Sequence, residues 1–261
     1  MLYLIFTIFT MKDCKFLFVV PVLLLMGQLL GAQNFEYKWQ RVRMDSTYES
    51  ATVYPVDRII AEHQEQMGPL MKVVIYSNAE IEEAQPESAL TNLVADMLIH
   101  AAQPYIDNDY PTMSLTNMGG IRSNFPKGAV RVYDIYSTLP FNNSVVVAVM
   151  KGKDVREILE NFARRERFEA LGGVRILVED KEIENCLIGG QPLEEDGLYN
   201  LVTIDFLLDG GDRFHIGSEA VSIKRTGIVM RDAAVAYLEE LSESGVVLEN
   251  RTDGRVIIDE D

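Results

Sequence analysis

Cysteine and histidine are both scarce in this chain, which removes two common ways of stabilising or activating a protein. The 261 residues include two cysteines, Cys14 and Cys186, and three histidines. Cys14 lies in an N-terminal apolar region that we expect to be removed, so Cys186 has no partner for an internal disulfide. The histidines are far apart, and no HxH, HExxH, CxxC, GxSxG or P-loop spacing occurs. We therefore predict no catalytic residue, no metal site and no cofactor in this chain.

Positive charge is also in short supply. Lysine and arginine number 24 against 40 aspartate and glutamate residues, which gives a formal net charge of −16. The N-terminal apolar region carries one net positive charge, so its removal changes the total to −17. Such a chain repels phosphate backbones, and we expect no nucleic-acid partner. Solubility alone explains the charge, although one local positive site can still bind a small anion.

The first 32 residues have the order of a secretory signal peptide. Residues 11–15 are a short charged stretch, residues 16–30 are almost wholly apolar, and Gly31 and Ala32 supply small residues for cleavage. The alternative is an uncleaved anchor, because residues 1–10 are apolar too, but charged residues interrupt the combined run. We expect cleavage near Ala32 and an exported protein, periplasmic or extracellular, with no membrane attachment afterwards.

The remaining residues divide into a lead-in and one domain. Residues 33–53 are polar and mixed, with the only tryptophan, Trp39, and we expect them to be extended. Residues 54–261 are long enough for one domain with its own core. Apolar periodicity predicts helices over 56–67, 90–101, 155–162 and 228–241, and strands over 71–76, 113–116, 130–133, 145–150, 174–178, 198–204 and 256–258. Helices and strands mix without strict βαβ alternation, which indicates an α+β fold in layers.

Four segments contain the residue types of a ligand pocket, although each has an ordinary structural explanation as well. They are 87–96 (ESALTNLVAD), 117–122 (NMGGIR), 139–143 (LPFNN) and 209–214 (DGGDRF). The glycine pairs are compatible with simple turns. Phenylalanines are more often core residues than ligand contacts, and a lone arginine is usually a solvated surface charge.

Taken together, however, the same side chains form the parts of a pocket for a flat polar ligand. Glycines such as Gly119 and Gly120 let a backbone approach a ligand and offer N–H donors. Arg122 carries a fork of donors that suits a phosphate or carboxylate. Phe141 and Phe214, on separate loops, are able to sandwich a planar ring. The side-chain amides of Asn117 and Asn143 both donate and accept hydrogen bonds.

These segments, in order and at similar spacing, resemble the C-terminal domain of the 5′-nucleotidase family, which includes periplasmic UDP-sugar hydrolases and surface ecto-nucleotidases. The similarity covers residues 57–241 and includes the helix signature GKDVREILE that follows residue 151. The resemblance implies an α+β fold, a layered α/β/β/α sandwich. It also implies a nucleotide or nucleoside ligand bound by Asn117, Gly119, Gly120, Arg122, Phe141, Asn143, Gly173, Asp212 and Phe214, with both phenylalanines stacked on the base.

The chain departs from the family pattern in three places. The family's separate metallophosphoesterase domain, which holds two metal ions, has no counterpart here. Ala84 stands near the place where many members have an arginine for the nucleotide, and Arg213 replaces a usual small residue. The resemblance therefore implies a nucleotide-recognising chain that completes a split 5′-nucleotidase, with the divalent metals on a separate metallophosphoesterase partner. The alternatives are a nucleoside-binding protein without hydrolysis and a scaffold that has lost its ligand.

Overall fold

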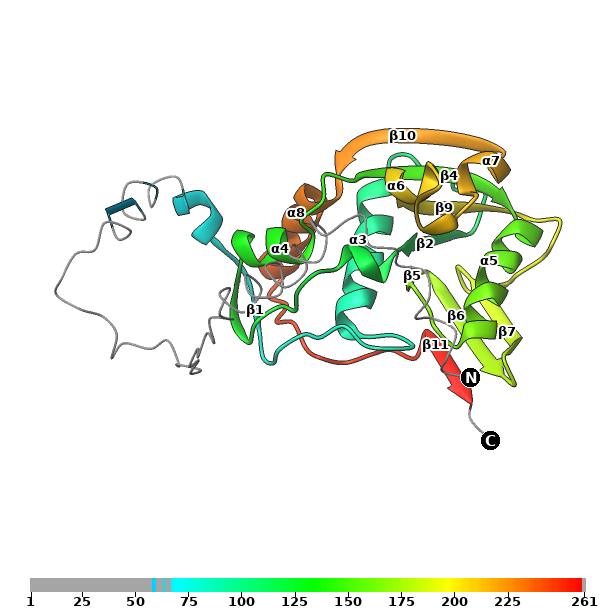
Figure 1. The fold of residues 1–261 in the computed structure, drawn as a ribbon, viewed down its shortest axis with the longest axis horizontal. Coiled ribbons are helices and arrows are strands. Elements are labelled where there is room, and N and C mark those ends of the chain that lie inside the picture. Colours follow the sequence, from blue (N-terminus) through cyan, green and yellow to red (C-terminus); the bar gives the residue numbers. More distant parts are fainter. Residues whose placement is uncertain (1–57, 60–62, 64–66, 260–261) are drawn as a thin grey trace, which may run out of the picture. The chain divides into compact units, whose positions relative to one another are not determined.

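The structure is a computed structural model that describes residues 58–59, 63 and 67–259 (Figure 1). The predicted signal peptide, the lead-in of residues 33–53 and most of the predicted helix over 56–67 lie outside the described residues. Helices and strands are mixed, as expected for an α+β fold, and the strands form three sheets. Among the described residues, none of the helices has the length and apolar character needed to cross a membrane.

The largest sheet has five strands in the order β10-β4-β9-β2-β5. Its strands are β2 (Thr112–Thr116), β4 (Ser144–Lys151), β5 (Ala170–Gly172), β9 (Leu198–Ile204) and β10 (Ser222–Val229). The valine-rich run of β4 is buried over six consecutive residues, so both of its faces are covered, as the uninterrupted apolar pattern predicts. Strand β2 is parallel to β9, and all other pairs in this sheet are antiparallel.

The central helix α3 (Ala89–Ala102) packs against this sheet (Figure 1). Ser88 caps it, because its hydroxyl accepts a hydrogen bond from the backbone N–H of Thr91 at 3.1 Å, while the Thr91 hydroxyl accepts one from the N–H of Ser88. The helix approaches β5 closely at Gly172, where an added Cβ would lie 3.1 Å from the carbonyl group of Ala95 in α3 and 2.5 Å from the hydroxyl oxygen of Ser114 in β2. The apolar stripe after Ser88 therefore became a helix as predicted, and glycine is required where it meets the sheet.

A second sheet of four strands has the order β11-β6-β7-β8. Its strands are β6 (Val174–Glu179), β7 (Glu182–Ile188), β8 (Gln191–Pro192) and β11 (Val256–Asp259). The helix α5 (Gly152–Arg165) contacts both β4 and β7, and so joins the two sheets. Cys186 is buried in β7 as a free thiol, and burial raises its pKa to about 11. The thiol therefore stays protonated at neutral pH.

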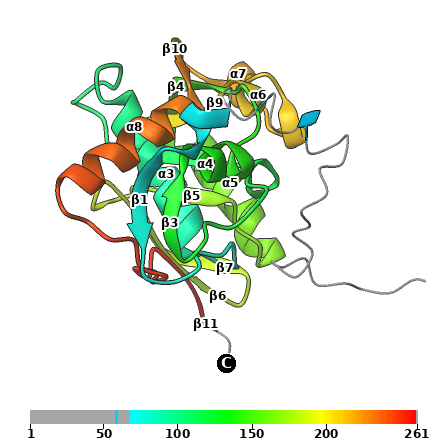
Figure 2. The ribbon, with the colours of Figure 1, turned by 90° about the vertical axis from the view of Figure 1, so that its left-hand side faces the viewer.

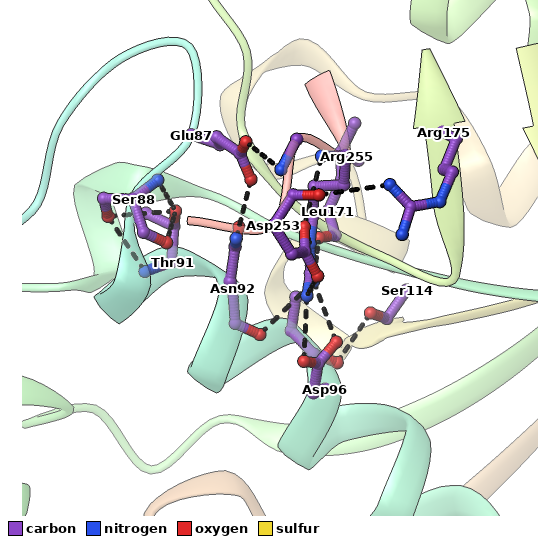
Figure 3. A network of polar contacts seen from close by, with 12 residues as sticks. Glu87, Ser88, Thr91, Asn92, Asp96, Ser114, Leu171, Arg175, Asp253 and Arg255 are labelled. Atoms are coloured by element: carbon purple, nitrogen blue, oxygen red, sulfur yellow. Dashed lines mark hydrogen bonds and ion pairs between the residues drawn. The ribbon is translucent and has the colours of Figure 1, made fainter. Parts of the chain in front are cut away.

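The segment before β11 is fastened to α3 by a network of polar contacts that we call the Arg255 clasp (Figure 3). The Arg255 side chain is only 8% exposed, and its two Nη atoms donate to the two carboxylate oxygens of Asp96 at 2.8 and 2.9 Å. It also donates to the carboxylate of Asp253 and to the carbonyl oxygen of Leu171. Glu87 accepts from the backbone N–H of Gly254 at 2.8 Å and from the side chain of Asn92.

A two-stranded sheet, the helix α8 and six short helical elements complete the described part of the domain. Strands β1 (Val73–Ser77) and β3 (Gly128–Arg131) pair antiparallel, and α8 (Met230–Glu243) lies beside β1 (Figure 2). The short elements are η2 (Gly68–Met71), η3 (Met118–Gly120), α4 (Val132–Thr138), α6 (Asp205–Leu208), η4 (Gly211–Arg213) and α7 (Ile216–Glu219).

Some sequence expectations at element boundaries were wrong. The predicted strand over 71–76 begins at Val73, because residues 68–71 form η2. The predicted strand over 130–133 ends at Arg131, because the Asp134 carboxylate accepts from the Arg131 N–H at 2.7 Å and starts helix α4. The predicted helix over 228–241 begins two residues later, since residues 228 and 229 belong to strand β10, which had no clear apolar alternation.

Candidate functional site

Three of the four highlighted loops meet at one cavity of about 210 Å³, which we call the turn cavity. It is bounded by the turn around η3, the loop before β4, and the segment from α6 to η4. The lining residues are Asn117, Gly119, Gly120, Arg122, Phe141, Asn143, Phe206 and Asp212. The five-stranded sheet brings these loops together, because β4, β9 and β2 are adjacent strands. One loop follows β2, one precedes β4 and one follows β9. The volume is small for a whole ligand, so the cavity suits one ring and its substituents.

Asn117 and Asp212 form the polar centre of the turn cavity. The Asn117 amide nitrogen donates to the Asp212 carboxylate at 2.7 Å. Asn117 is 7% exposed, and its carbonyl oxygen Oδ1 is buried without a hydrogen-bond partner. A buried acceptor without a donor costs about 1–3 kcal/mol, and a native structure tolerates it mainly where another group completes it. This oxygen therefore lacks a donor in the structure, and it belongs to a residue that lines the turn cavity.

Two aromatic rings flank this polar centre and are open to solvent. Phe141 is 42% exposed and Phe206 is 44% exposed, which is unusual for phenylalanine. The Arg122 guanidinium lies 5.3 Å from the centre of the Phe141 ring, within range of a cation–π contact. None of the carboxylates that the structure describes forms an ion pair with Arg122. Exposed rings next to an unpaired cation are typical of a surface that binds a flat anionic molecule.

Phe206 is the residue that the sequence analysis missed. It lies in α6, where its neighbours Leu207 and Leu208 are fully or almost fully buried while Phe206 points outward. Gly211 makes this placement possible, because an added Cβ there would lie 2.5 Å from the Phe206 carbonyl oxygen and 2.6 Å from its ring. The sequence did contain a signal for Phe206, because three consecutive apolar residues stand between a buried strand and a glycine pair. A single helical turn cannot bury all three, so one of them has to face solvent.

Seven of the nine predicted site residues line the turn cavity, and Phe214 and Gly173 do not. Gly173 has a positive φ of 69°, and an added Cβ would lie 2.4 Å from the carbonyl oxygen of Thr112. Its role in the structure is therefore close backbone packing between strands. The residue lies outside the turn cavity, and its part in ligand binding stays a prediction.

Phe214 lies instead in an adjoining cavity of about 300 Å³ between α5 and the loop from η4 to α7. It is partly buried, and its ring packs edge-on against Phe162 with the ring centres 6.1 Å apart. Asp212 lines both cavities. The predicted sandwich of Phe141 and Phe214 is thus not assembled in one cavity, whereas Phe141 and Phe206 do share one.

Two residues of the glycine-rich loop adopt a backbone conformation that disfavours side chains. Asp212 has φ 51° and Arg213 has φ 66°, both in the left-handed region. This conformation costs an L-residue other than glycine roughly 1–2 kcal/mol, and such residues concentrate at functional sites. Arg213 stands where the family resemblance implies a small residue, so the sequence departure and the strained position coincide.

The site offers hydrogen-bonding and stacking groups, and its residues include no metal-binding group. Among the residues that the structure describes, three or more histidine, cysteine, aspartate or glutamate side chains nowhere gather to hold a metal ion. The polar groups of the turn cavity are amides, one guanidinium and one carboxylate. Such an arrangement binds and orients a ligand.

Comparison with known proteins gives one consistent answer. The model of the family described as 5′-nucleotidase, C-terminal domain, matches residues 67–219. The protein UshA of Yersinia enterocolitica is 29% identical over 156 residues, which are 58% of this chain and 28% of UshA. The trifunctional nucleotide phosphoesterase protein YfkN of Bacillus subtilis is 24% identical, across 88% of this chain and 17% of its own length.

Solved structures agree with the sequence comparison. The crystal structure of a 5′-nucleotidase precursor from Thermus thermophilus superimposes with a TM-score of 0.66 and 25% identity, covering 78% of this chain and 42% of that one. The chain therefore spans less than half the length of these relatives.

Proposed function

Because the chain belongs to the 5′-nucleotidase C-terminal domain family, we propose that it recognises a nucleotide or nucleoside in the turn cavity. The observation that supports this most strongly is the combination of two exposed phenylalanines with one buried, unpaired acceptor. Phe141 and Phe206 stack on the base, in a contact worth roughly 1–3 kcal/mol per base. Asn117 Oδ1 accepts a hydrogen bond from the ligand, and Arg122 binds a phosphate or the ribose.

Calorimetric titration with nucleosides and their 5′-monophosphates tests this assignment. Adenosine, guanosine, uridine and cytidine, each with its monophosphate, form the panel, and ribose 5-phosphate is the control because it lacks a ring to stack. We expect at least one nucleoside or nucleotide to bind clearly more tightly than ribose 5-phosphate. Equal affinity for ribose 5-phosphate would contradict the base clamp, and no binding of any compound at millimolar concentration would contradict the proposal.

The catalytic context of this chain is the second part of the proposal. We propose that it is exported and completes a split 5′-nucleotidase, in which a separate metallophosphoesterase supplies two metal ions. The support is the family membership together with a set of site residues suited to binding. Two-metal hydrolysis needs several ligands that hold the metals, activate water and clamp the phosphate, and the turn cavity supplies amides, one guanidinium and a single carboxylate. The predicted signal peptide is the support for export.

Reconstitution with a separate metallophosphoesterase tests the split enzyme. The two chains together should form a complex and release phosphate from nucleotides faster than the metallophosphoesterase alone. The chain alone, supplied with Mn²⁺, Mg²⁺, Zn²⁺ or Co²⁺, should release none. Phosphate release that survives repurification of the single chain and is lost in Arg122→Ala would show that the chain is itself an enzyme.

Capture of nucleosides without hydrolysis is the second candidate, and Ala84 favours it. Ala84 is exposed, and no arginine accompanies Arg122 at the turn cavity in the described residues. A site with a single guanidinium gains little from each added phosphate. If adenosine binds as tightly as its monophosphate and no partner chain associates, nucleoside capture replaces the split enzyme.

A further inference from the structure

Glu169 lies behind the turn cavity and touches the backbone of the turn that forms its wall. One carboxylate oxygen of Glu169 accepts a hydrogen bond from the backbone N–H of Met118 at 2.6 Å. Met118 is the first residue of η3, directly after Asn117. A carboxylate that accepts from a backbone N–H forms a charge-assisted bond, which is stronger than a neutral one. Glu169 itself does not line the turn cavity.

Glu169 is held in place from its other side. The side chain of Gln85 donates to the carbonyl oxygen of Phe168 at 2.9 Å and accepts from the Phe168 N–H at 2.9 Å. The Gln85 side chain also contacts the sulfur of Met118. Phe168, the residue before Glu169, is therefore fixed by two hydrogen bonds with Gln85. Because the Glu169 backbone is held in this way, its carboxylate in turn holds the Met118 N–H in place.

The backbone of η3 determines where the Asn117 side-chain amide points. An added Cβ at Gly120 would lie 3.0 Å from Asn117 Oδ1, and one at Gly119 would lie 3.6 Å from Asn117 Nδ2. The backbone of η3 thus wraps closely around this amide. Asp212 holds the nitrogen end at 2.7 Å, so the oxygen end stays unpaired. A shift of Met118 would move both ends of the amide.

We infer that Glu169 is a positioning residue of the turn cavity, which pins η3 and keeps Asn117 Oδ1 presented to the ligand. The inference rests on the proposed function, since it assigns a role within the same site.

Three variants separate positioning from a general structural role. Glu169→Ala removes the acceptor, and Glu169→Gln keeps an oxygen in the same place without the charge. Glu157→Ala is the matched control, because Glu157 is exposed and lines the adjoining cavity, as Glu169 does, but in the described part of the chain it forms no hydrogen bond or ion pair with η3. The probe is the nucleoside or nucleotide that binds the unaltered chain best, and binding and thermal unfolding are measured for each variant.

We expect Glu169→Ala to weaken binding about tenfold, because η3 and the Asn117 amide lose their fixed position. Glu169→Gln should recover most of the affinity, and Glu157→Ala should bind and unfold like the unaltered chain. Glu169→Ala also loses an intramolecular hydrogen bond, so it should unfold at a somewhat lower temperature than Glu169→Gln but remain folded in the binding experiment. Unchanged binding in Glu169→Ala would overturn the inference. So would a loss that Glu169→Gln does not rescue and that follows the unfolding temperature, since that result indicates a purely structural role.

A ligand-free measurement keeps this test independent of the proposed function. In NMR spectra of the free protein, Glu169→Ala should shift the backbone amide of Met118 and the side-chain amide of Asn117, and Glu157→Ala should shift neither. If the unaltered chain binds no nucleoside, the proposed function fails while these shifts still test the positioning. An unmoved Asn117 side-chain amide would overturn the inference in either case.

Discussion

Arg255 and Arg122 belong to two regions of the domain that treat their polar groups in opposite ways. In the Arg255 clasp, the guanidinium is 8% exposed and bonds to two carboxylates and a backbone carbonyl oxygen (Figure 3). In the turn cavity, Arg122 is exposed and rests on Phe141, and Asn117 keeps an unpaired oxygen. In the Arg255 clasp the donors and acceptors bond to one another. In the turn cavity some of these groups remain without a partner among the described residues and are therefore available to a ligand.

The four sequence segments that resemble the family differ in their role in the structure. Glu87, Asn92 and Asp96 all belong to the first motif, and each takes part in the clasp. The N-x-GGIR motif instead forms the wall of the turn cavity. One set of motif residues therefore holds the domain together, and the other is available for recognition.

The largest expected effect comes from breaking the clasp. Arg255→Met removes the positive partner of two carboxylates, one of them on α3, and should lower the free energy of unfolding by about 2–4 kcal/mol. The value lies below that of a fully buried ion pair, because water reaches the two carboxylates that are left behind. Urea denaturation measures this. Arg251→Met is the control, since Arg251 is exposed in the same segment. Should Arg255→Met unfold the domain entirely, Asp96→Asn gives a milder version. A loss below 1 kcal/mol for both variants would show that the clasp is not structural.

The next effect tests which phenylalanine serves the ligand. Phe206→Ala should weaken nucleoside binding by roughly 1–3 kcal/mol, with little loss of stability because the ring is 44% exposed. Phe214→Ala should do the reverse, since its ring packs on Phe162. Calorimetry and thermal melts of both variants decide the matter. If Phe214→Ala loses affinity and keeps its stability, the pairing predicted from sequence is right and the turn cavity is the wrong site.

A smaller effect is expected from relieving the strained loop. Arg213→Gly places at φ 66° a residue that adopts this conformation without a steric penalty. The gain is partly offset by the greater freedom of glycine in the unfolded chain, so we expect a net stabilisation of roughly 0.5–1 kcal/mol. Urea denaturation of this variant beside Arg164→Gly, an exposed helical position, provides the comparison. A destabilised Arg213→Gly would mean that the arginine side chain itself stabilises the loop.

The smallest effect concerns acid. The hydrogen bond from Arg255 lowers the pKa of the Asp253 carboxyl below its usual value of 3.8. A lowered folded-state pKa gives stability that is present above pH 3.8 and lost as the pH falls through the folded value. Because Asp253 is half exposed, the contribution is a fraction of about 1 kcal/mol. Asp253→Asn should therefore be slightly less stable at pH 7 and equal to the unaltered chain in strong acid. If the difference in unfolding free energy between Asp253→Asn and the unaltered chain is the same at pH 7 and in strong acid, the charge of Asp253 does not cause it.

Much of the fold was predictable because its elements have strong local signals. Ser88 before a 3.6-residue stripe predicted α3, and the valine run predicted β4. Strand β10 was not predictable, since it is an exposed edge strand whose residues alternate only weakly. Its partner β4 and the hydrogen bonds between them determine it, and these depend on residues far away in sequence.

The candidate site was predictable in composition but not in pairing. Seven of the residues that the motifs singled out line one cavity, and their role in binding stays a prediction. Which phenylalanine shares the turn cavity with Phe141 depends on the direction of one side chain on a single helical turn, and motif order carries no such information. The burial of Leu207 and Leu208 determines this direction, because those two residues turn inward and Phe206 must turn outward.

The Arg255 clasp also has a consequence for how the chain folds. Arg255 follows Asp96 by 159 residues, and Gly254 follows Glu87 by 167 residues. Contacts at such separations form late, because the entropy of closing the long loop must be overcome before they contribute. A chain emerging from the ribosome therefore exposes the carboxylates of α3 until the segment around Arg255 has been synthesised. We expect chains that stop before Arg255 to be sensitive to proteases.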